Sequence, residues 1–203
     1  MNIQLHKVSK RFDSGWVIRD LDLEIRSGDK LAIKGANGSG KSTLIQILAG
    51  YLSISKGKLV FEHGTEPVNR DDIYKYLSIS TAYSELDEEL RPSELFTHFR
   101  SFKDYHIEDL DEFLDLIDLK EHKNKEVKYF SSGMKQRLSL GLAICMDVPL
   151  LILDEPGSFL DQERKLWLKD MLERFCSEKT VIIASNEASD LEFCDKELEL
   201  KPL

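Results

Sequence analysis

The stretch GANGSGKST, residues Gly35–Thr43, is the feature that most constrains the fold of this chain. It follows a short apolar run at residues 30–35 and precedes residues 41–52, whose apolar side chains recur at helical spacing. A glycine-rich turn between a strand and a helix directs backbone N–H groups to one point, and the helix dipole adds positive potential there. The pattern G-x-x-x-x-G-K-[ST] in this setting therefore predicts a phosphate-binding loop in an α/β fold.

This loop predicts a role for each of its polar residues. We expect Lys41 to reach the β- and γ-phosphates of a nucleotide, Ser42 to ligate Mg²⁺ through its hydroxyl, and Thr43 to contact the phosphates near the α-position. The other loop residues predicted to contact the nucleotide are Gly35, Asn37, Gly38, Ser39 and Gly40. The alternative is a glycine-rich turn that only caps a helix, and the flanking strand and helix disfavour it.

A second motif, LLILDEP at residues 150–156, is an apolar strand that ends in two carboxylates. A strand that is apolar on both faces is typical of the centre of a parallel sheet, and ligands bind beside the carboxyl ends of such strands. We expect Asp154 to hold Mg²⁺, mainly through water, and Glu155 to polarise an attacking water as general base. Taken alone, the motif also fits a strand followed by a solvated turn. Kinases, GTPases and many ATPases share both motifs, so the family stays open here.

The rest of the pattern predicts one α/β unit over residues 1–203, with a mostly parallel sheet flanked by helices. An antiparallel β portion is expected at the N-terminus and a small helical subdomain at about residues 83–130, between core segments 1–82 and about 131–203. The expected strands outside the two motifs are 2–8, 17–25, 57–64 and 180–185, and the expected helices include 107–119 and 161–178. The strand at 180–185 is expected to be the last, with no regulatory domain after it.

Composition excludes several classes of protein. The 28 Lys and Arg residues against 37 Asp and Glu, a formal charge of −9, disfavour a nucleic-acid binder. The three cysteines are widely spaced without a CxxC pair, so we expect a reduced cytosolic protein without disulfides or a zinc site. No run approaches the roughly 18–20 apolar residues that span a bilayer, and the N-terminus lacks the apolar block of a signal peptide.

The stretch KYFSSGMKQRLSLGLAI, residues 128–144, looks like a second anion site. Ser131 and Ser132 are good N-cap types, and an apolar stripe follows at helical spacing. A helix start with serine hydroxyls, a glycine and free N–H groups binds phosphate for the same reasons as the first loop. Because the chain's own loop already holds one nucleotide, the simplest ligand is a nucleotide bound to another subunit. An ordinarily capped helix is the alternative.

These motifs together resemble the nucleotide-binding subunit of an ATP-binding-cassette (ABC) transporter over nearly the whole chain. FSSGMKQRLSLGLAI matches the family signature, usually Leu-Ser-Gly-Gly-Gln, and SFLD right after LDEPG matches its D-loop. The resemblance implies a head-to-tail dimer that sandwiches two ATP molecules between one subunit's loop and the other's signature. It assigns the signature contacts to Ser131, Ser132, Gly133 and Met134, and the D-loop to Ser158, Leu160 and Asp161. It also implies that Phe12, with Trp16 as the alternative, stacks on adenine.

The chain departs from the family pattern at two positions. The usual glutamine before the helical insert aligns with Ala82, for which Glu85 or Ser84 are possible substitutes, and the usual histidine after the last strand is Asn186. An amide still donates a hydrogen bond to the γ-phosphate, but it has no ionised form, which costs about 1 kcal/mol of transition-state stabilisation. Since Glu155 is present, we expect slower hydrolysis rather than its loss.

The resemblance therefore implies an ATPase that uses ATP and Mg²⁺, pairs with a second ABC subunit and drives a separate membrane-spanning permease, with exporter-type favoured. Such a subunit lies in the cytoplasm on the inner face of the membrane. The first alternative is a degenerate subunit that binds ATP while a partner hydrolyses it, favoured by Ala82 and Asn186 and opposed by Lys41, Asp154 and Glu155. The second is a soluble ABC ATPase of DNA repair or translation, although such relatives usually carry two cassettes or a long coiled coil. Cargo, direction, homo- or heterodimer and the permease remain open.

Overall fold

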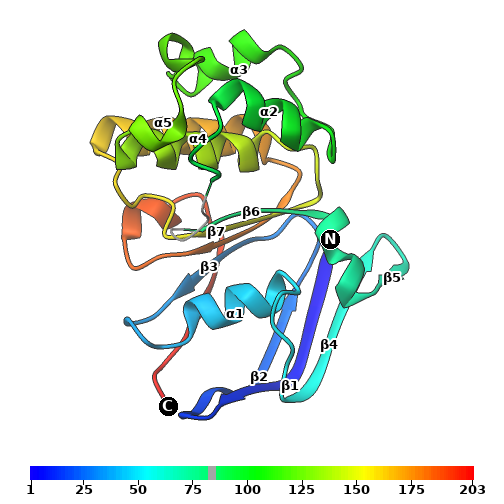
Figure 1. Ribbon diagram of the computed structural model, residues 1–203. Helices are drawn as coiled ribbons and strands as arrows, with labels where there is room; N and C mark the ends of the chain where they lie inside the picture. Colours follow the sequence, from blue (N-terminus) through cyan, green and yellow to red (C-terminus); the bar gives the residue numbers. More distant parts are fainter. Residues whose placement is uncertain (82–85) are drawn as a thin grey trace.

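The structure is a computed structural model that describes residues 1–81 and 86–203, and within these residues the strands form two sheets (Figure 1). The larger sheet has the order β6-β7-β8-β3-β9 with parallel neighbours throughout. Its strands are β3 (Lys30–Lys34), β6 (Leu77–Thr81), β7 (Leu150–Asp154), β8 (Thr180–Ala184) and β9 (Lys196–Glu199). The smaller sheet has the order β2-β1-β4-β5 with antiparallel neighbours. Its strands are β1 (Asn2–Phe12), β2 (Gly15–Ile25), β4 (Lys56–His63) and β5 (Glu66–Val68).

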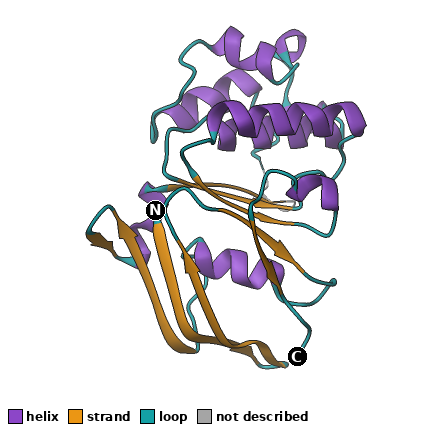
Figure 2. Ribbon diagram, turned by 180° about the vertical axis from the view of Figure 1, so that it is seen from behind, coloured by secondary structure: helices purple, strands orange, loops and turns teal. Residues whose placement is uncertain are grey.

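Helices cover both faces of the parallel sheet (Figures 1 and 2). Helix α1 (Lys41–Leu48) lies on the face shared with the antiparallel sheet. The opposite face carries α4 (Ser132–Ile144) and α5 (Gln162–Phe175), with α2 (Pro92–Arg100) and α3 (Leu110–Leu116) beyond them. Short 3₁₀ helices are Arg70–Lys75, Lys120–His122, Val127–Tyr129 and Ala188–Leu191. None of the helices in the described ranges combines the length and apolar character needed to cross a membrane.

The alternation of side chains along the central strands divides the core in two. On β7, Leu151 and Leu153 pack with the helical layer, whereas Leu150 and Ile152 pack with α1 and the antiparallel sheet. Successive side chains of a strand point to opposite faces, so a strand with a layer on each face must be apolar throughout. All residues of β7 and β8 are buried, which is the physical origin of the continuous apolar runs in the sequence.

The predicted α/β class, with a mostly parallel sheet and an N-terminal antiparallel portion, is confirmed. Two local predictions are wrong. Helix α1 ends at Leu48 rather than near residue 52, because Gly50 turns into the left-handed region at φ +78°. Tyr51, which belongs to the apolar pattern of residues 41–52, is therefore 66% exposed instead of buried on the face of the helix. The strand at 180–185 is also not the last: β9 follows it at the sheet edge, and its mostly exposed, charged sequence KELE carries no apolar signal.

The helical layer offers a test of core packing. Phe113 of α3 is 0% exposed and stacks on Phe96 with ring centroids 4.6 Å apart. We expect Phe113→Ala to lower the free energy of unfolding by about 3–5 kcal/mol, because it leaves a cavity that the neighbours cannot fill. Leu166→Ala is the control, since Leu166 on α5 is 65% exposed and its loss should cost within about 0.5 kcal/mol. Urea unfolding followed by circular dichroism measures both, and equal midpoints for the two variants would contradict this packing.

Candidate functional site

The predicted phosphate loop connects β3 to α1, with Gly40 as N-cap residue at φ +99°. Gly35 lies at φ +151°, and a Cβ at this position would overlap the Leu200 carbonyl and the Ser39 hydroxyl. A side chain there would push the loop away from β9, because Leu200 donates its backbone N–H to the Lys34 carbonyl at 2.8 Å. Glycine is therefore required where the loop passes between the sheet edge and its own buried serine.

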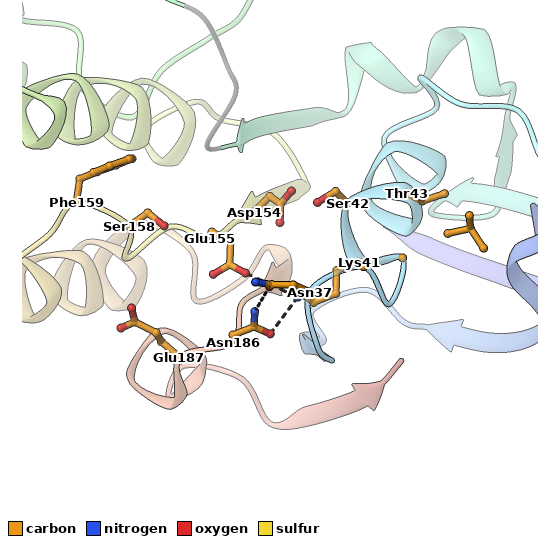
Figure 3. A pocket seen from close by; sticks show the side chains of 13 residues that line it. Asn37, Lys41, Ser42, Thr43, Asp154, Glu155, Ser158, Phe159, Asn186 and Glu187 are labelled. Atoms are coloured by element: carbon orange, nitrogen blue, oxygen red, sulfur yellow. Dashed lines mark hydrogen bonds and ion pairs between the residues drawn. The ribbon is translucent and has the colours of Figure 1, made fainter. Parts of the chain in front are cut away.

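A cavity of about 750 Å³ opens beside this loop, at the carboxyl ends of β7 and β8 (Figure 3). Its volume lies in the range typical of small-molecule and cofactor sites. The cavity joins the loop to residues that follow β7 and β8 in the sequence. Its lining consists of Val17, Asn37, Gly38, Gly40, Lys41, Ser42, Thr43, Asp154, Glu155, Ser158, Phe159, Asn186 and Glu187.

Lys41 is the cation in the lining of this cavity (Figure 3). It is only 7% exposed. Its Nζ donates to the Gly35 carbonyl at 2.7 Å and to Asn186 Oδ1 at 3.0 Å, and it lies 3.9 Å from Glu155 Oε1. A buried ammonium group needs such acceptors to offset its lost hydration. The contact with Gly35 also keeps the Lys41 ammonium at the N-terminus of α1, where a bound anion would lie.

The side chain of Asn186 joins the loop to the end of β8. Its Oδ1 accepts from Lys41 and its Nδ2 donates to Asn37 Oδ1 at 2.8 Å. The residue predicted to contact the γ-phosphate therefore lies against two predicted nucleotide-binding residues, although they are far apart in the sequence. The amide oxygen thus accepts one hydrogen bond and one of the two amide N–H groups donates another within the cavity.

Glu155 owes its position to the register between β7 and β8. Asp154 pairs with Ala184, and the Glu155 backbone N–H donates to the Ala184 carbonyl at 2.7 Å before the chain turns at φ +51°. Its side chain is 29% exposed, with Oε1 toward Lys41 and Oε2 accepting from the Ser185 hydroxyl at 3.0 Å. The carboxylate is thus held at both oxygens and still faces the cavity.

Asp154 has the properties of a cation ligand. It is 4% exposed, and its Oδ1 has no hydrogen-bond partner among the described residues. Burial raises the pKa of this carboxyl, against the opposing effects of a hydrogen bond from Ser42 and the Lys41 charge. Carboxylate and hydroxyl oxygens suit Mg²⁺, which also keeps several of its waters. An unpartnered oxygen beside a serine hydroxyl therefore fits a divalent cation (Figure 3).

The turn after Glu155 brings the predicted D-loop to the cavity. Ser158 lines it, whereas Leu160 packs against the core of the helical layer and Asp161 caps α5 by accepting from the Arg164 N–H at 2.9 Å. Phe159, which the sequence reasoning left unassigned, also lines the cavity at φ +65° and is 67% exposed. Figure 3 shows Phe159 next to Ser158 in this lining.

The predicted signature begins α4 outside the cavity. The Ser131 hydroxyl accepts from the Met134 N–H at 3.3 Å, and Ser131 and Ser132 are exposed. None of the residues Ser131, Ser132, Gly133 and Met134 lines the cavity. A Cβ on Gly133 would lie 3.1 Å from the Phe159 carbonyl, so the signature approaches the D-loop of its own chain. Gln136 of α4 is buried and donates to the Pro156 carbonyl at 2.9 Å, next to Glu155.

The two aromatic candidates for adenine do not line the cavity. Phe12 is 41% exposed at the end of β1, with the Lys10 Nζ 5.0 Å from its ring centroid, and Trp16 lies beside Arg11 and Lys56. Val17 of β2 lines the cavity instead. The stacking role of Phe12 stays a prediction. Predictions for Ala82, Ser84 and Glu85 fall on residues outside the described ranges.

The sequence reasoning missed Val17, Phe159 and Glu187 in the lining, and Ser185 and Asp190 behind it. A signal existed for Ser185, since a polar residue directly after a buried strand lies beside the carboxyl end of the neighbouring strand. Gly35 and Ser39 support the loop without lining the cavity, and Ser39 is 2% exposed.

The chain is similar in sequence to proteins of a known family. The family model described as "ABC transporter" matches residues 18–158. The uncharacterized ABC transporter ATP-binding protein YhcH of Bacillus subtilis is 30% identical over 210 residues, covering 96% of this chain and 65% of that protein. The lantibiotic transport ATP-binding protein SrtF of Streptococcus pyogenes is 31% identical over 202 residues, covering 94% of this chain and 82% of that protein.

A solved structure shares the fold. The dimeric structure of MJ0796, a bacterial ABC transporter cassette, matches with a TM-score of 0.81 at 20% identity, over 98% of this chain and 94% of that chain. The chain spans less than two thirds of the length of several curated relatives, including YhcH. The family match, the relatives and the fold agree with the strand, loop and helix described above: the chain belongs to the ABC transporter family and has the fold of its ATP-binding cassettes.

Proposed function

We propose that this chain binds ATP with Mg²⁺ and hydrolyses it as one half of an ATP-sandwich dimer. The observation that carries the proposal is the cavity itself, where Lys41 Nζ lies 3.9 Å from Glu155 Oε1. Asp154 Oδ1, which has no hydrogen-bond partner within residues 1–81 and 86–203, lies beside Ser42. One cavity is therefore lined by a cation that can bind phosphate, by oxygens that can hold a metal ion and by a carboxylate that can activate a water molecule. These are the parts that phosphoryl transfer to water requires.

Phosphate binding is assigned to the loop between β3 and α1. Lys41 exchanges its contacts with Gly35 and Asn186 for the β- and γ-phosphate oxygens, and backbone N–H groups at the α1 N-terminus add further donors. The remaining proposed contacts are Asn37, Gly38, Gly40, Ser42 and Thr43, with Phe12 for adenine, whereas Gly35 and Ser39 support the loop from behind. Ser42 and Asp154 would hold Mg²⁺, which would orient the terminal phosphates and neutralise their charge.

Hydrolysis is assigned to Glu155. Its carboxylate accepts a proton from a water molecule as the water oxygen attacks the γ-phosphorus, and the bond to the β–γ bridging oxygen breaks to release ADP and phosphate. Asn186 contacts the γ-phosphate as a neutral donor. Its lack of charge favours modest turnover and, together with Ala82 in the sequence, supports the alternative of a weakly hydrolysing partner in a heterodimer. Turnover by the purified wild-type chain separates the two.

The second half of the site is assigned to another copy or a related subunit. Ser131, Ser132, Gly133 and Met134 lie outside the chain's own cavity, as contacts to a partner's nucleotide require. Ser158, Leu160 and Asp161 would complete the interface as the D-loop. By family, the dimer powers a membrane-spanning permease, which we propose to be of exporter type, with this chain on the inner face of the membrane.

Dimer formation tests this proposal. We expect Glu155→Gln, whose hydrolysis should be strongly slowed, to change from monomer to dimer on addition of Mg-ATP, as measured by sedimentation velocity. Ser132→Arg in the same background should remain monomeric yet bind ATP, because Ser132 is exposed at the start of α4, whereas Ser131 keeps the capping bond. The matched control is Ser177→Arg, an exposed serine after α5 and outside every assigned motif. A sandwich dimer is ruled out if the Ser132→Arg and Ser177→Arg proteins dimerise equally.

A further inference from the structure

The carboxyl group of Asp190 lies behind the nucleotide cavity and takes part in none of the roles assigned above. Asp190 belongs to the 3₁₀ helix Ala188–Leu191 and is 6% exposed. Its Oδ2 lies 2.7 Å from Ser185 Oγ and accepts from the Gly157 N–H at 3.3 Å, whereas its Oδ1 has no partner among the described residues. A buried carboxyl group with an unpartnered oxygen is costly, so its contacts need an explanation.

The two groups that Asp190 contacts, the Gly157 N–H and the Ser185 hydroxyl, both belong to residues close to Glu155. Gly157 follows Glu155 by two residues, in a turn that the Ser158 N–H closes by donating to the Glu155 carbonyl at 3.1 Å. A Cβ on Gly157 would overlap the Asp190 carboxyl, so the turn is packed directly against this group. Ser185 is 0% exposed and follows β8, in register beside the residue that follows β7. The carboxyl group of Asp190 therefore contacts the backbone and the side-chain neighbour of the proposed base.

The Ser185 hydroxyl faces three partners. It accepts from the Glu187 N–H at 3.0 Å, and it lies 3.0 Å from Glu155 Oε2 and 2.7 Å from Asp190 Oδ2. A hydroxyl group has one proton and two lone pairs, so it cannot donate to both carboxylates at once. All three contacts are hydrogen bonds only when one of the two carboxyl groups carries a proton and donates it to Ser185.

The surroundings select Asp190 as the protonated group. Glu155 lies 3.9 Å from the Lys41 ammonium and is 29% exposed. Asp190 is buried, and the charges around it are Lys165 of α5, which lies against Glu187 and Ser189, and the Glu187 carboxylate itself. Burial raises the pKa of the Asp190 carboxyl, against the Ser185 hydrogen bond and the Lys165 charge. A proton on Asp190 Oδ2 lets the Ser185 hydroxyl donate its own proton to Glu155 Oε2.

We propose that Asp190 is a positioning residue for Glu155: its protonated Oδ2 donates to Ser185 Oγ, and Ser185 in turn donates to Glu155 Oε2. This inference rests on the proposed function, because it takes Glu155 as the base. The chain of hydrogen bonds holds Oε2 against the end of β8 and leaves Oε1 on the side of the cavity, near Lys41. When each group in such a chain donates to the next, the hydrogen bonds polarise one another, and the bond from Ser185 to the Glu155 carboxylate becomes stronger.

Kinetics test the positioning. Ser185→Ala is expected to lower kcat for Mg-ATP hydrolysis about tenfold while KM and the Kd for nucleotide stay within about twofold, because a displaced base impairs the chemical step only. Ser185→Thr, which keeps the hydroxyl, should restore most of kcat, and Ser189→Ala on the same 3₁₀ helix is the matched control. Asp190→Asn keeps a donor for Ser185 and should retain most of kcat, whereas Asp190→Ala should resemble Ser185→Ala. An unchanged kcat in Ser185→Ala overturns the proposal, and so does a rise in KM alone.

A spectroscopic readout keeps the inference separable from the proposed function. Infrared difference spectra between wild type and Asp190→Asn at neutral pH should contain the carbonyl stretch of a protonated carboxylic acid, which needs no turnover. A carboxylate band in its place shows that Asp190 is ionised and overturns the proposal even if hydrolysis is normal. A wild-type chain that lacks ATPase activity yet shows the protonated band refutes the proposed hydrolysis and leaves the hydrogen-bond chain standing. Thermal melting of each variant identifies any that fails to fold.

Discussion

Glu155→Gln is expected to lower the steady-state rate of ATP hydrolysis by about 10²–10⁴-fold, which is the usual contribution of a general base. Glutamine has nearly the same shape, but its single amide oxygen can keep only one of the contacts of Glu155 with Lys41 and Ser185, and its amide cannot accept the proton of an attacking water. The Kd for Mg-ATP should stay within a few-fold of wild type, because the phosphate-binding groups remain. A coupled assay of phosphate release and an isothermal titration with ATP measure the two quantities.

The control for this experiment is Glu173→Gln, an equal change of charge on an exposed position of α5 away from the cavity. Its rate should match wild type. A wild-type rate no higher than that of Glu155→Gln would refute hydrolysis by this chain and favour a subunit that binds ATP for a catalytic partner. A large loss of ATP affinity in Glu155→Gln would instead assign Glu155 to binding.

Lys41→Met is expected to weaken nucleotide binding roughly 10- to 150-fold, the equivalent of about 1.5–3 kcal/mol for a hydrogen bond to a charged group. Methionine keeps the apolar stem of the side chain but loses the ammonium group that donates to Gly35 and Asn186. The loss should fall mainly on nucleoside di- and triphosphates, because the proposed contacts are with the β- and γ-phosphates. Titration with ATP, ADP and AMP measures this dependence.

Lys58→Met on the exposed side of β4 is the control for the change of net charge and should bind like wild type. Thermal melting without nucleotide should show that Lys41→Met folds. Equal weakening of ATP and AMP binding would contradict the assigned contacts, since AMP lacks both phosphates that Lys41 is proposed to reach. Together, the two substitutions separate a defect in hydrolysis from a defect in binding.

Local sequence was sufficient for the elements that carry the strongest signals. The loop at Gly35–Thr43 is recognisable because glycines, a lysine and a hydroxyl at fixed spacing suit one geometry between strand and helix. The strand at residues 150–154 is recognisable because a strand covered on both faces must be apolar throughout. The same reasoning failed for β9, which lies at a sheet edge and has little apolar surface to bury.

Other parts of the site depend on contacts between distant segments. The approach of Asn186 to Asn37 and Lys41 follows from the order of β8 and β3 in the sheet, which no local pattern encodes. The arrangement of the strands also determines which aromatic or apolar residue reaches the cavity. Val17 lines it, whereas Phe12 does not. Side-chain position across a sheet depends on register, and register is a long-range property.

By itself, the sequence determined the α/β class, the phosphate loop, the paired carboxylates at residues 154–155 and the resemblance to ABC cassettes, because each depends on residue types at short, fixed spacings. Only the tertiary structure decided that the signature serine lies outside the chain's own cavity and that the Asp190 carboxyl stands behind Glu155. The physical reason is that parallel pairing of β7 with β8 brings residues 155 and 185 together, and this pairing is stabilised by the burial of two whole core layers rather than by any local motif.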